Sequence, residues 1–354
     1  MQELSRVLKI LLLPFSAVYY LIILLRNKFY DWGIFKSSDV GVKVISVGNI
    51  SYGGTGKTPT VIYLTQLLKR LGKKPGILSR GYGRSTKGYK LVSNGETLFC
   101  NTAECGDEII MEAVSCNVPA AVSEDRVAGA TNFIDDAKID TIVLDDAFQH
   151  RKIKRDIDLV LLDLNFFANA KFPDCFLLPS GVFREPFSSL NRADVILLNR
   201  KFNQTLELND KLKKVLNGKT YFSVRYDIDE IYDVKTRKRY EVSEFEGQHS
   251  LAVSGIAQPG SFFTSLDKIG IKITEKLIFR DHKKYSLDDI QIIRKKFYDT
   301  NAYSIITTEK DAVKLIDYST ELDDVDIYFL KIKLVIDEEE KFISLIKNLF
   351  LSFE

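Results

Sequence analysis

The sequence predicts an α/β protein with a doubly wound parallel sheet, a second, smaller α/β domain and an N-terminal helix that associates with a membrane. Three observations predict this architecture. Short apolar runs alternate with helical patterns between residues 44 and 200, which is typical of a parallel sheet covered by helices. A second series of strand and helix patterns begins at Ser250. Sixteen uncharged, mostly apolar residues lie between Lys9 and Arg26.

The chain has 354 residues, which is enough for two domains of ordinary size. Hydrophobic residues make up 45% and charged residues 28%, so the chain can bury a substantial core. Fifty basic and 48 acidic residues give a net charge of +2. This nearly neutral charge gives no indication that the protein binds nucleic acid. The four cysteines form no CxxC pair and have no histidine nearby. We therefore expect neither a disulfide framework nor a zinc site, and we expect a reducing cytosol.

The most informative stretch runs from Val44 to Pro59, with the sequence VISVGNISYGGTGKTP. It reads as a buried strand, a glycine-rich loop and the start of a helix. Backbone amides of such a loop can close on phosphate oxygens, and the helix N-terminus adds partial positive charge. Lys57 would reach the outer phosphates and Thr58 would ligate Mg²⁺. Ser51 stands where the G-x-x-x-x-G-K-[ST] pattern has its first glycine, and a glycine-rich turn without nucleotide chemistry is the alternative.

Acidic residues follow at two further places in this half of the chain. The apolar run from Thr141 ends in Asp145 and Asp146, a Walker-B arrangement in which a carboxylate at a strand end holds Mg²⁺ directly or through water. Asp107 and Glu108 begin a helical pattern. They could simply complement the helix dipole. Beside a phosphate loop, a carboxylate here could instead take a proton from an attacking hydroxyl.

The N-terminal apolar run would span about 24 Å as a helix, which is short of a hydrocarbon core of about 30 Å. Pro14 would kink this helix in its first half. Basic flanks favour a monotopic, in-plane or re-entrant anchor on anionic lipid. A single membrane span and a helix buried against the protein are the alternatives.

The remaining patterns divide the chain. We expect a membrane-associated helix over 1–37, a phosphate-loop domain over 38–218, a hairpin linker over 219–248 and a C-terminal α/β domain over 249–354. In the last of these, Ser304 to Thr308 reads as a strand that ends in Glu309, Lys310 and Asp311. Loops at the strand ends of both halves would face one cleft, a common place for a two-substrate site.

Assembled in order, these residues resemble the tetraacyldisaccharide 4′-kinases, the lipid A 4′-kinases of Gram-negative bacteria, over nearly the whole chain. The matching motifs are VGNISYGGTGKTP, SRGYGR, GDE at 106–108, DDAFQHR at 145–151, PSGVFREP, RADVILLNR, VSGIAQP, FRDHKKY and TTEKDAVKL. Two positions depart from the family pattern. Ala147 replaces a glycine after the paired aspartates, and Lys283 replaces a second histidine after His282.

The resemblance implies a reaction in which ATP, with Mg²⁺, phosphorylates the 4′-hydroxyl of a tetraacylated glucosamine disaccharide 1-phosphate in lipid A and lipopolysaccharide biosynthesis. It implies an enzyme that works at the cytoplasmic face of the bacterial inner membrane and contacts that lipid surface, and we expect this enzyme to be a monomer. It also implies a cleft that closes on ATP.

Site residues follow from the same resemblance, position by position. The catalytic group comprises Lys57, Asp107, Asp146 and His282, with Asp107 as general base assisted by His282. The nucleotide loop comprises Ser51, Tyr52, Gly53, Gly54, Thr55, Gly56, Lys57 and Thr58. The metal ligands would be Thr58, Asp145 and Asp146. Contacts to the disaccharide phosphate would come from Tyr82, Arg126, Gln149, His150, Arg184 and Glu185.

Two other functional classes compete with a lipid kinase. One is a membrane-associated P-loop NTPase with a switch or partition role, which would need a base-specificity motif such as N-K-x-D. Residues 199–202, with the sequence NRKF, do not supply it. The other is a membrane scaffold with a degenerate nucleotide site. The presence of Lys57, Thr58, Asp107 and Asp146 argues against the scaffold.

Overall fold

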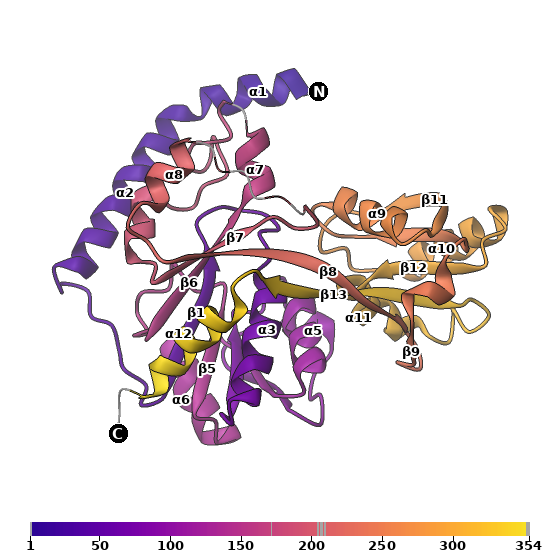
Figure 1. The fold of residues 1–354 in the computed structure, drawn as a ribbon, viewed down its shortest axis with the longest axis horizontal. Coiled ribbons are helices and arrows are strands. Elements are labelled where there is room, and N and C mark those ends of the chain that lie inside the picture. The colour runs from indigo at the N-terminus through magenta and orange to yellow at the C-terminus, as the bar shows by residue number, and fades with distance from the viewer. Residues whose placement is uncertain (1, 171, 204, 206–207, 209, 352–354) are drawn as a thin grey trace.

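A computed structural model describes residues 2–170, 172–203, 205, 208 and 210–351. Within these residues the strands form a single 13-stranded sheet that runs through both halves of the molecule. Its order is β11-β10-β12-β13-β8-β7-β6-β1-β5-β2-β4-β3, with β9 paired to β8. Figure 1 shows helices covering both faces of the sheet in the N-terminal half.

The N-terminal half is the expected doubly wound sheet, and its strands run parallel except for β3. The strands are β1 (Lys43–Asn49), β2 (Pro75–Ser79), β3 (Lys90–Asn94), β4 (Pro119–Val122), β5 (Thr141–Asp145), β6 (Ile157–Asp163) and β7 (Val195–Asn199). The larger helices are α3 (Lys57–Arg70), α5 (Asp107–Cys116) and α6 (Arg126–Ala137). Shorter ones are α4 (Thr102–Cys105), α7 (Leu164–Asn169), α8 (Asp210–Leu216) and the 3-10 turn η1 (Phe187–Arg192). Because β1 lies between β5 and β6, the ends of these buried strands bring their loops to one edge.

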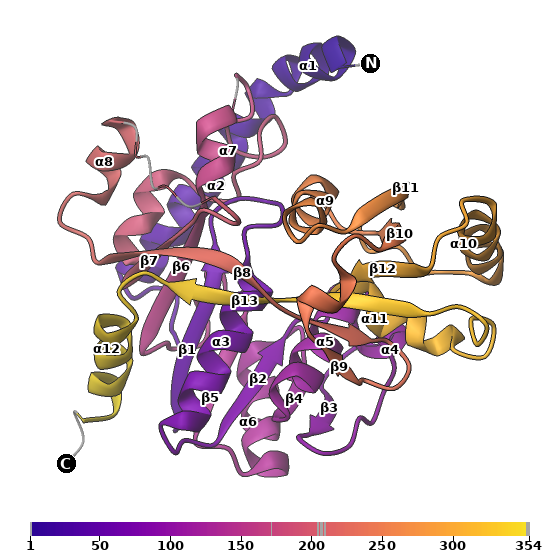
Figure 2. The ribbon, with the colours of Figure 1, turned by 45° about the vertical axis from the view of Figure 1, so that its right-hand side comes forward.

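A long antiparallel ribbon joins the two halves. It consists of β8 (Tyr221–Asp233) and β13 (Ile327–Ile336), which pair along most of their length. The start of β8 pairs with β7, and the start of β13 pairs with β12, so the halves lie at opposite ends of the ribbon. Figures 1 and 2 show both strands crossing the middle of the molecule. The expected hairpin is present, because β9 (Arg239–Tyr240) pairs antiparallel with β8.

The C-terminal half is a smaller α/β unit. Its strands are β10 (His249–Ser254), β11 (Lys272–Ile278) and β12 (Ser304–Thr308), which run parallel to one another and to β13. Its helices are α9 (Pro259–Lys268), α10 (Leu287–Asp299), α11 (Glu309–Leu315) and the 3-10 turns η2 (Val242–Phe245) and η3 (Ile316–Tyr318). The chain returns to the first half as α12 (Glu339–Leu351), whose Phe342 and Ile346 are buried in the N-terminal core.

The N-terminal segment forms two helices, α1 (Gln2–Leu11) and α2 (Leu13–Asp31), interrupted at Leu12 close to Pro14. The Lys9 ammonium lies 2.7 Å from Asp174, and the Ser16 hydroxyl donates to the carbonyl of Leu177 at 2.8 Å. These contacts hold the helices against the 174–185 segment. Many of their apolar side chains stay exposed. No helix among the described residues is both long and apolar enough to cross a bilayer.

Three details differ from expectation or lie partly outside the description. Strand β3 was not expected. A disulfide joins Cys100 and Cys105, whose Cα atoms lie 6.3 Å apart, so the expectation of no disulfide is wrong. Cys105 is the last residue of the short helix α4, which begins just after Cys100, and their sequence spacing did not reveal this arrangement. The polar sequence of residues 203–219 predicts a helix, of which the structure describes only α8, since residues 204, 206, 207 and 209 lie outside the described residues.

Candidate functional site

The glycine-rich loop lies between β1 and α3, at the centre of the strand ends. Gly56 precedes the helix with φ +100°, a conformation that L side chains rarely adopt. A Cβ atom there would lie 2.1 Å from the Tyr226 hydroxyl oxygen and 2.3 Å from the Asn199 amide nitrogen. Asn199 also donates to the carbonyl of Thr55 at 2.8 Å. The end of β7 and the ribbon strand β8 therefore hold the loop in shape.

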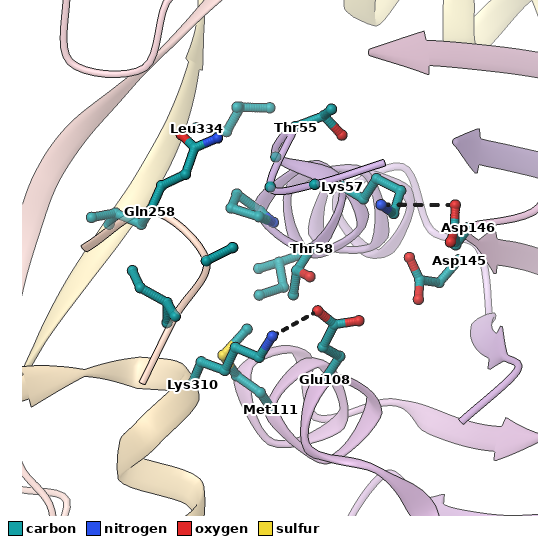
Figure 3. A pocket seen from close by; sticks show the side chains of 18 of the residues that line it. Thr55, Lys57, Thr58, Glu108, Met111, Asp145, Asp146, Gln258, Lys310 and Leu334 are labelled. Carbon is teal, nitrogen blue, oxygen red and sulfur yellow. Dashed lines mark hydrogen bonds and ion pairs between the residues drawn. The ribbon is translucent and has the colours of Figure 1, made fainter. Parts of the chain in front are cut away.

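Two acids lie beside the loop, at and after the end of β5. Arg184 donates two hydrogen bonds of 2.7 and 3.0 Å to the carboxylate of Asp146. The Lys57 ammonium lies 3.8 Å from the same carboxylate. Burial acts to raise the pKa of Asp146, but these two cations outweigh it and hold the pKa at about 2. Asp146 has a φ of +48°, which is uncommon outside glycine. The turn after β5 therefore presents Asp146 to Lys57, as Figure 3 shows.

Asp145 has a different environment. Its Oδ2 accepts a hydrogen bond from the Ser79 hydroxyl at 3.0 Å, whereas its buried Oδ1 has no hydrogen-bond partner. Burial and the nearby carboxylates of Glu108 and Asp146 raise the pKa of Asp145. Glu112, buried beneath this region, has both carboxylate oxygens without a partner, and burial and Asp145 raise its pKa. A cation placed against Asp145 would relieve this accumulation of acids.

The residues present fit a magnesium ion bound together with a nucleotide. Among the described residues, no group of three or more His, Cys, Asp or Glu side chains forms a protein-only metal site. Mg²⁺ commonly takes one or two carboxylates and fills its remaining positions with phosphate oxygens and water. The unpartnered Oδ1 of Asp145, next to the phosphate loop, fits that mode.

A third cluster brings the two halves together. Asp107 is the first residue of α5, and His282 lies in the turn after β11 with a φ of +54°. Their Oδ1 and Nδ1 atoms are 3.3 Å apart. Burial acts to raise the pKa of Asp107, but His282, Lys310 and Lys314 outweigh it and hold the pKa at about 2. Hydrogen bonding to Asp107 raises the pKa of His282.

These features surround one cavity of about 730 Å³. Its walls come from the phosphate loop, the loops after β2 and β5, the turn holding His282, the start of α11 and the middle of β13. Helix α2 also contributes, through Tyr19, Ile23 and Arg26. The cavity is therefore lined by both halves and by the N-terminal helices, and ligand sites are common at such interfaces.

Four of the six expected disaccharide-phosphate contacts line this cavity, namely Tyr82, Gln149, His150 and Arg184. Burial and nearby arginines lower the pKa of His150 to about 4, so it is neutral at pH 7. The ring of Tyr82 is exposed and lies 5.1 Å from the imidazole of His282.

The other two expected contacts lie behind the cavity wall. The Arg126 side chain is 1% exposed, with its guanidinium between the carbonyls of Ser123 and Asp145. Glu185 is fully buried and accepts from Arg192 at 2.8 Å. Asp107, which is 8% exposed, lies at the edge of the cavity, next to Glu108 and His282, which line it.

Sequence reasoning missed Lys310 and Ser79. Lys310 reaches across the cavity to Glu108, 3.1 Å away, as Figure 3 shows. A signal for it was present, because TTEKDAVKL places Lys310 just after a strand end of the second half. Ser79 ends β2, and its place in the motif SRGYGR did not single it out as a site residue.

Comparisons with known proteins show the family of the chain. A family model for LpxK, described as tetraacyldisaccharide-1-P 4′-kinase, matches residues 8–351. The tetraacyldisaccharide 4′-kinase of Syntrophus aciditrophicus is 36% identical over 318 residues, covering 86% of this chain and 84% of the relative. The enzyme of the same name from Chlorobium phaeobacteroides is 34% identical and covers 96% and 97%.

A solved structure of LpxK from Aquifex aeolicus in complex with ATP superposes with a TM-score of 0.81 at 34% identity. The match covers 97% of this chain and 99% of that protein. It confirms the predicted α/β fold, and the strand, loop and helix order of the nucleotide site is consistent with a P-loop NTPase. The chain belongs to the tetraacyldisaccharide 4′-kinase family.

Proposed function

We propose that this enzyme transfers the γ-phosphoryl group of ATP to the 4′-hydroxyl of a tetraacylated disaccharide 1-phosphate, the reaction for which its relatives are named. One observation carries the proposal. The phosphate loop of the first half and the turn of the second half that holds His282 against Asp107 face the same cavity. A nucleotide on one wall would therefore lie near a proton-accepting pair on the other.

Residues Ser51 to Thr58 bind the phosphates of ATP, with Lys57 against the outer ones. Thr58, Asp145 and Asp146 would hold Mg²⁺. When bound, the ion neutralises charge on the phosphate oxygens and raises the electrophilicity of the γ-phosphorus. Arg184 keeps Asp146 ionised and oriented through its two hydrogen bonds. Positioning and charge neutralisation are the main demands of phosphoryl transfer.

In the reaction, the 4′-oxygen forms a bond to the γ-phosphorus while the bond from that phosphorus to the bridging β–γ oxygen breaks. ADP leaves with the electron pair of the broken bond. The hydroxyl proton passes to the Asp107–His282 pair, with the carboxylate of Asp107 as acceptor. Because the pKa of Asp107 is low, transfer of the proton becomes favourable only as the hydroxyl acidifies on bonding to phosphorus.

The acceptor lies on the side of the cavity formed by Tyr82, Gln149, His150 and Arg184. Arg184 lines the cavity and carries a planar donor fork that suits an anionic sugar phosphate. Arg126 and Glu185 act behind this wall. Arg126 contacts the backbone of Asp145, and Glu185 holds Arg192.

The N-terminal helices bring the enzyme to its lipid. Their outer face exposes large apolar side chains, including Phe15 at 63% and Ile22 at 57%, while Tyr19 and Ile23 of the same helix line the cavity. Leaving acyl chains in the bilayer avoids a cost of about 0.8 kcal/mol for each exposed CH₂. We therefore place the enzyme peripherally on the cytoplasmic face of the inner membrane, as a monomer.

Transfer of labelled γ-phosphate from ATP to tetraacyl disaccharide 1-phosphate in mixed micelles tests this proposal. We expect label in the lipid only when the acceptor is present. Equal ATP hydrolysis with and without the acceptor, and no labelled lipid, would favour the switch or partition NTPase. The family match does not favour that alternative.

A further inference from the structure

Lys310 has contacts that suggest a role in the proposed proton transfer. It is the second residue of α11, whose N-terminus is capped by the Thr308 hydroxyl. Its ammonium lies 3.1 Å from a carboxylate oxygen of Glu108 and 3.2 Å from Nε2 of His282. The Lys310 side chain is only 15% exposed. It therefore spans the cavity from the second half and reaches the helix that begins with Asp107.

The protonation of Lys310 follows from its neighbours. Burial acts to lower its pKa, but the carboxylates of Glu108, Asp107 and Asp281 outweigh burial and raise it. Lys310 is therefore an ammonium at neutral pH. An ammonium has three hydrogen-bond donors and no acceptor.

The hydrogen positions on His282 follow from its two partners. Asp107 is ionised and can only accept, so the Nδ1 atom 3.3 Å away must carry the hydrogen. Lys310 can only donate, so the Nε2 atom 3.2 Å away must present its lone pair. Both contacts select the same neutral form of the imidazole, with its hydrogen on Nδ1.

We infer that Lys310 is a positioning residue that holds His282 in the neutral Nδ1–H form and thereby leaves Asp107 as the proton acceptor. The imidazole then has no free lone pair for the substrate hydroxyl, because Lys310 occupies Nε2. A second hydrogen on Nε2 would also bring imidazolium and ammonium charges together. This inference rests on the proposed role of Asp107 and names the residue that fixes that role.

The charged and titratable groups around His282 come from four elements, so its charge depends on more than Lys310. Acids favour the imidazolium, and Lys310 disfavours it. The groups are Asp107 and Glu108 on α5, Lys310 on α11, Asp281 beside His282 in its own turn, and Tyr82 after β2. Removing the charge of Lys310 leaves only burial to oppose the acids, and this change raises the pKa of His282 further.

Nitrogen NMR of the imidazoles tests the inference without measuring activity. The chain has three histidines, so His282→Gln identifies the signals of His282. In the wild-type enzyme at about pH 8.5, we expect Nδ1 to give the signal of a protonated ring nitrogen and Nε2 that of an unprotonated one. A hydrogen on Nε2 would overturn the inference, and it would leave the kinase proposal intact.

The pH dependence of turnover gives a second test, with saturating ATP and lipid in mixed micelles. The acid limb is expected to report the protonation of His282. Lys310→Met should move its midpoint upward by about one pH unit, since the positive charge next to the imidazole has been removed. Lys310→Arg should keep the wild-type midpoint. Lys295→Met, at an exposed lysine on α10, is the matched control and should change nothing.

The two kinetic outcomes separate positioning from direct phosphate binding. A loss of the same size at every pH in Lys310→Met, with a raised KM for ATP, would mean that Lys310 contacts the phosphates and would overturn the inference. Absence of phosphate transfer by the wild-type enzyme would instead contradict the proposed function, whatever the tautomer of His282.

Discussion

The charge of Asp107 can be tested through stability as well as catalysis. In Asp107→Asn the side chain keeps its size and loses its charge. The carboxylate titrates at about 2 rather than at the usual 3.8. At about 1.36 kcal/mol for each pH unit between the two pKa values, the ionised group contributes about 2.4 kcal/mol to stability at neutral pH.

The sign of the pH dependence follows from the lowered pKa. A carboxylate whose pKa is lower in the folded state stabilises the protein above the unfolded value of 3.8 and loses this effect as the pH falls toward 2. The difference in unfolding free energy between wild type and Asp107→Asn should therefore be about 2.4 kcal/mol at pH 7 and about half of that at pH 3.

Urea unfolding at both pH values measures this difference. Asp323→Asn, at an exposed aspartate, is the control and should change stability by less than about 0.5 kcal/mol. Turnover of Asp107→Asn at neutral pH should fall by about 10² to 10⁴, the contribution of a general base, while ATP binding persists. An equal stability difference at pH 3 and pH 7 would refute the ion-pair reasoning. Turnover close to wild type would refute the role as base.

Three further predictions concern the nucleotide loop and the membrane. Lys57→Ala should weaken ATP binding in calorimetry and lower turnover. Undiminished activity would show that the glycine-rich loop has no part in the reaction. Gly56→Ala should destabilise the protein by about 1–3 kcal/mol because its φ of +100° is unfavourable for alanine, and the new Cβ also meets the Tyr226 hydroxyl at 2.1 Å. Gly54→Ala, whose Cβ would meet nothing within 4 Å, is its control, and equal thermal shifts would contradict the strain. Deleting residues 1–25 should move the enzyme from the membrane fraction to the soluble fraction, and unchanged retention after sedimentation would show that other surfaces suffice.

Much of the first half could be predicted because its signals are local. The strand from Val44, the glycines after it and the helix from Lys57 lie within a few residues of one another. The apolar run ending in Asp145 is equally compact. Parallel strands bring their ends to one edge, so the proximity of Lys57 to the acid pair followed from the fold class. In the structure, the Lys57 ammonium lies 3.8 Å from Asp146.

What could not be predicted depends on contacts between distant segments. The single sheet arises because β8 and β13 pair, although about a hundred residues separate them. The direction of a long side chain is also not a local property. Arg126 follows the helix cap Asp125, and it turns inward to the carbonyl of Asp145 rather than into the cavity. Lys310 lies in the motif TTEKDAVKL, but the sequence does not show which groups its ammonium contacts. These contacts form because the fold brings α11 close to α5.

The position of the transferred phosphate tests the central claim most directly. The full-length enzyme, ATP, Mg²⁺ and tetraacyl disaccharide 1-phosphate would react in mixed micelles, and phosphorus–proton correlation NMR would follow the lipid. We predict one new phosphate monoester, coupled to the proton at position 4′ and formed in equal amount with ADP. ADP formed together with inorganic phosphate, while the lipid keeps only its 1-phosphate, would contradict the account.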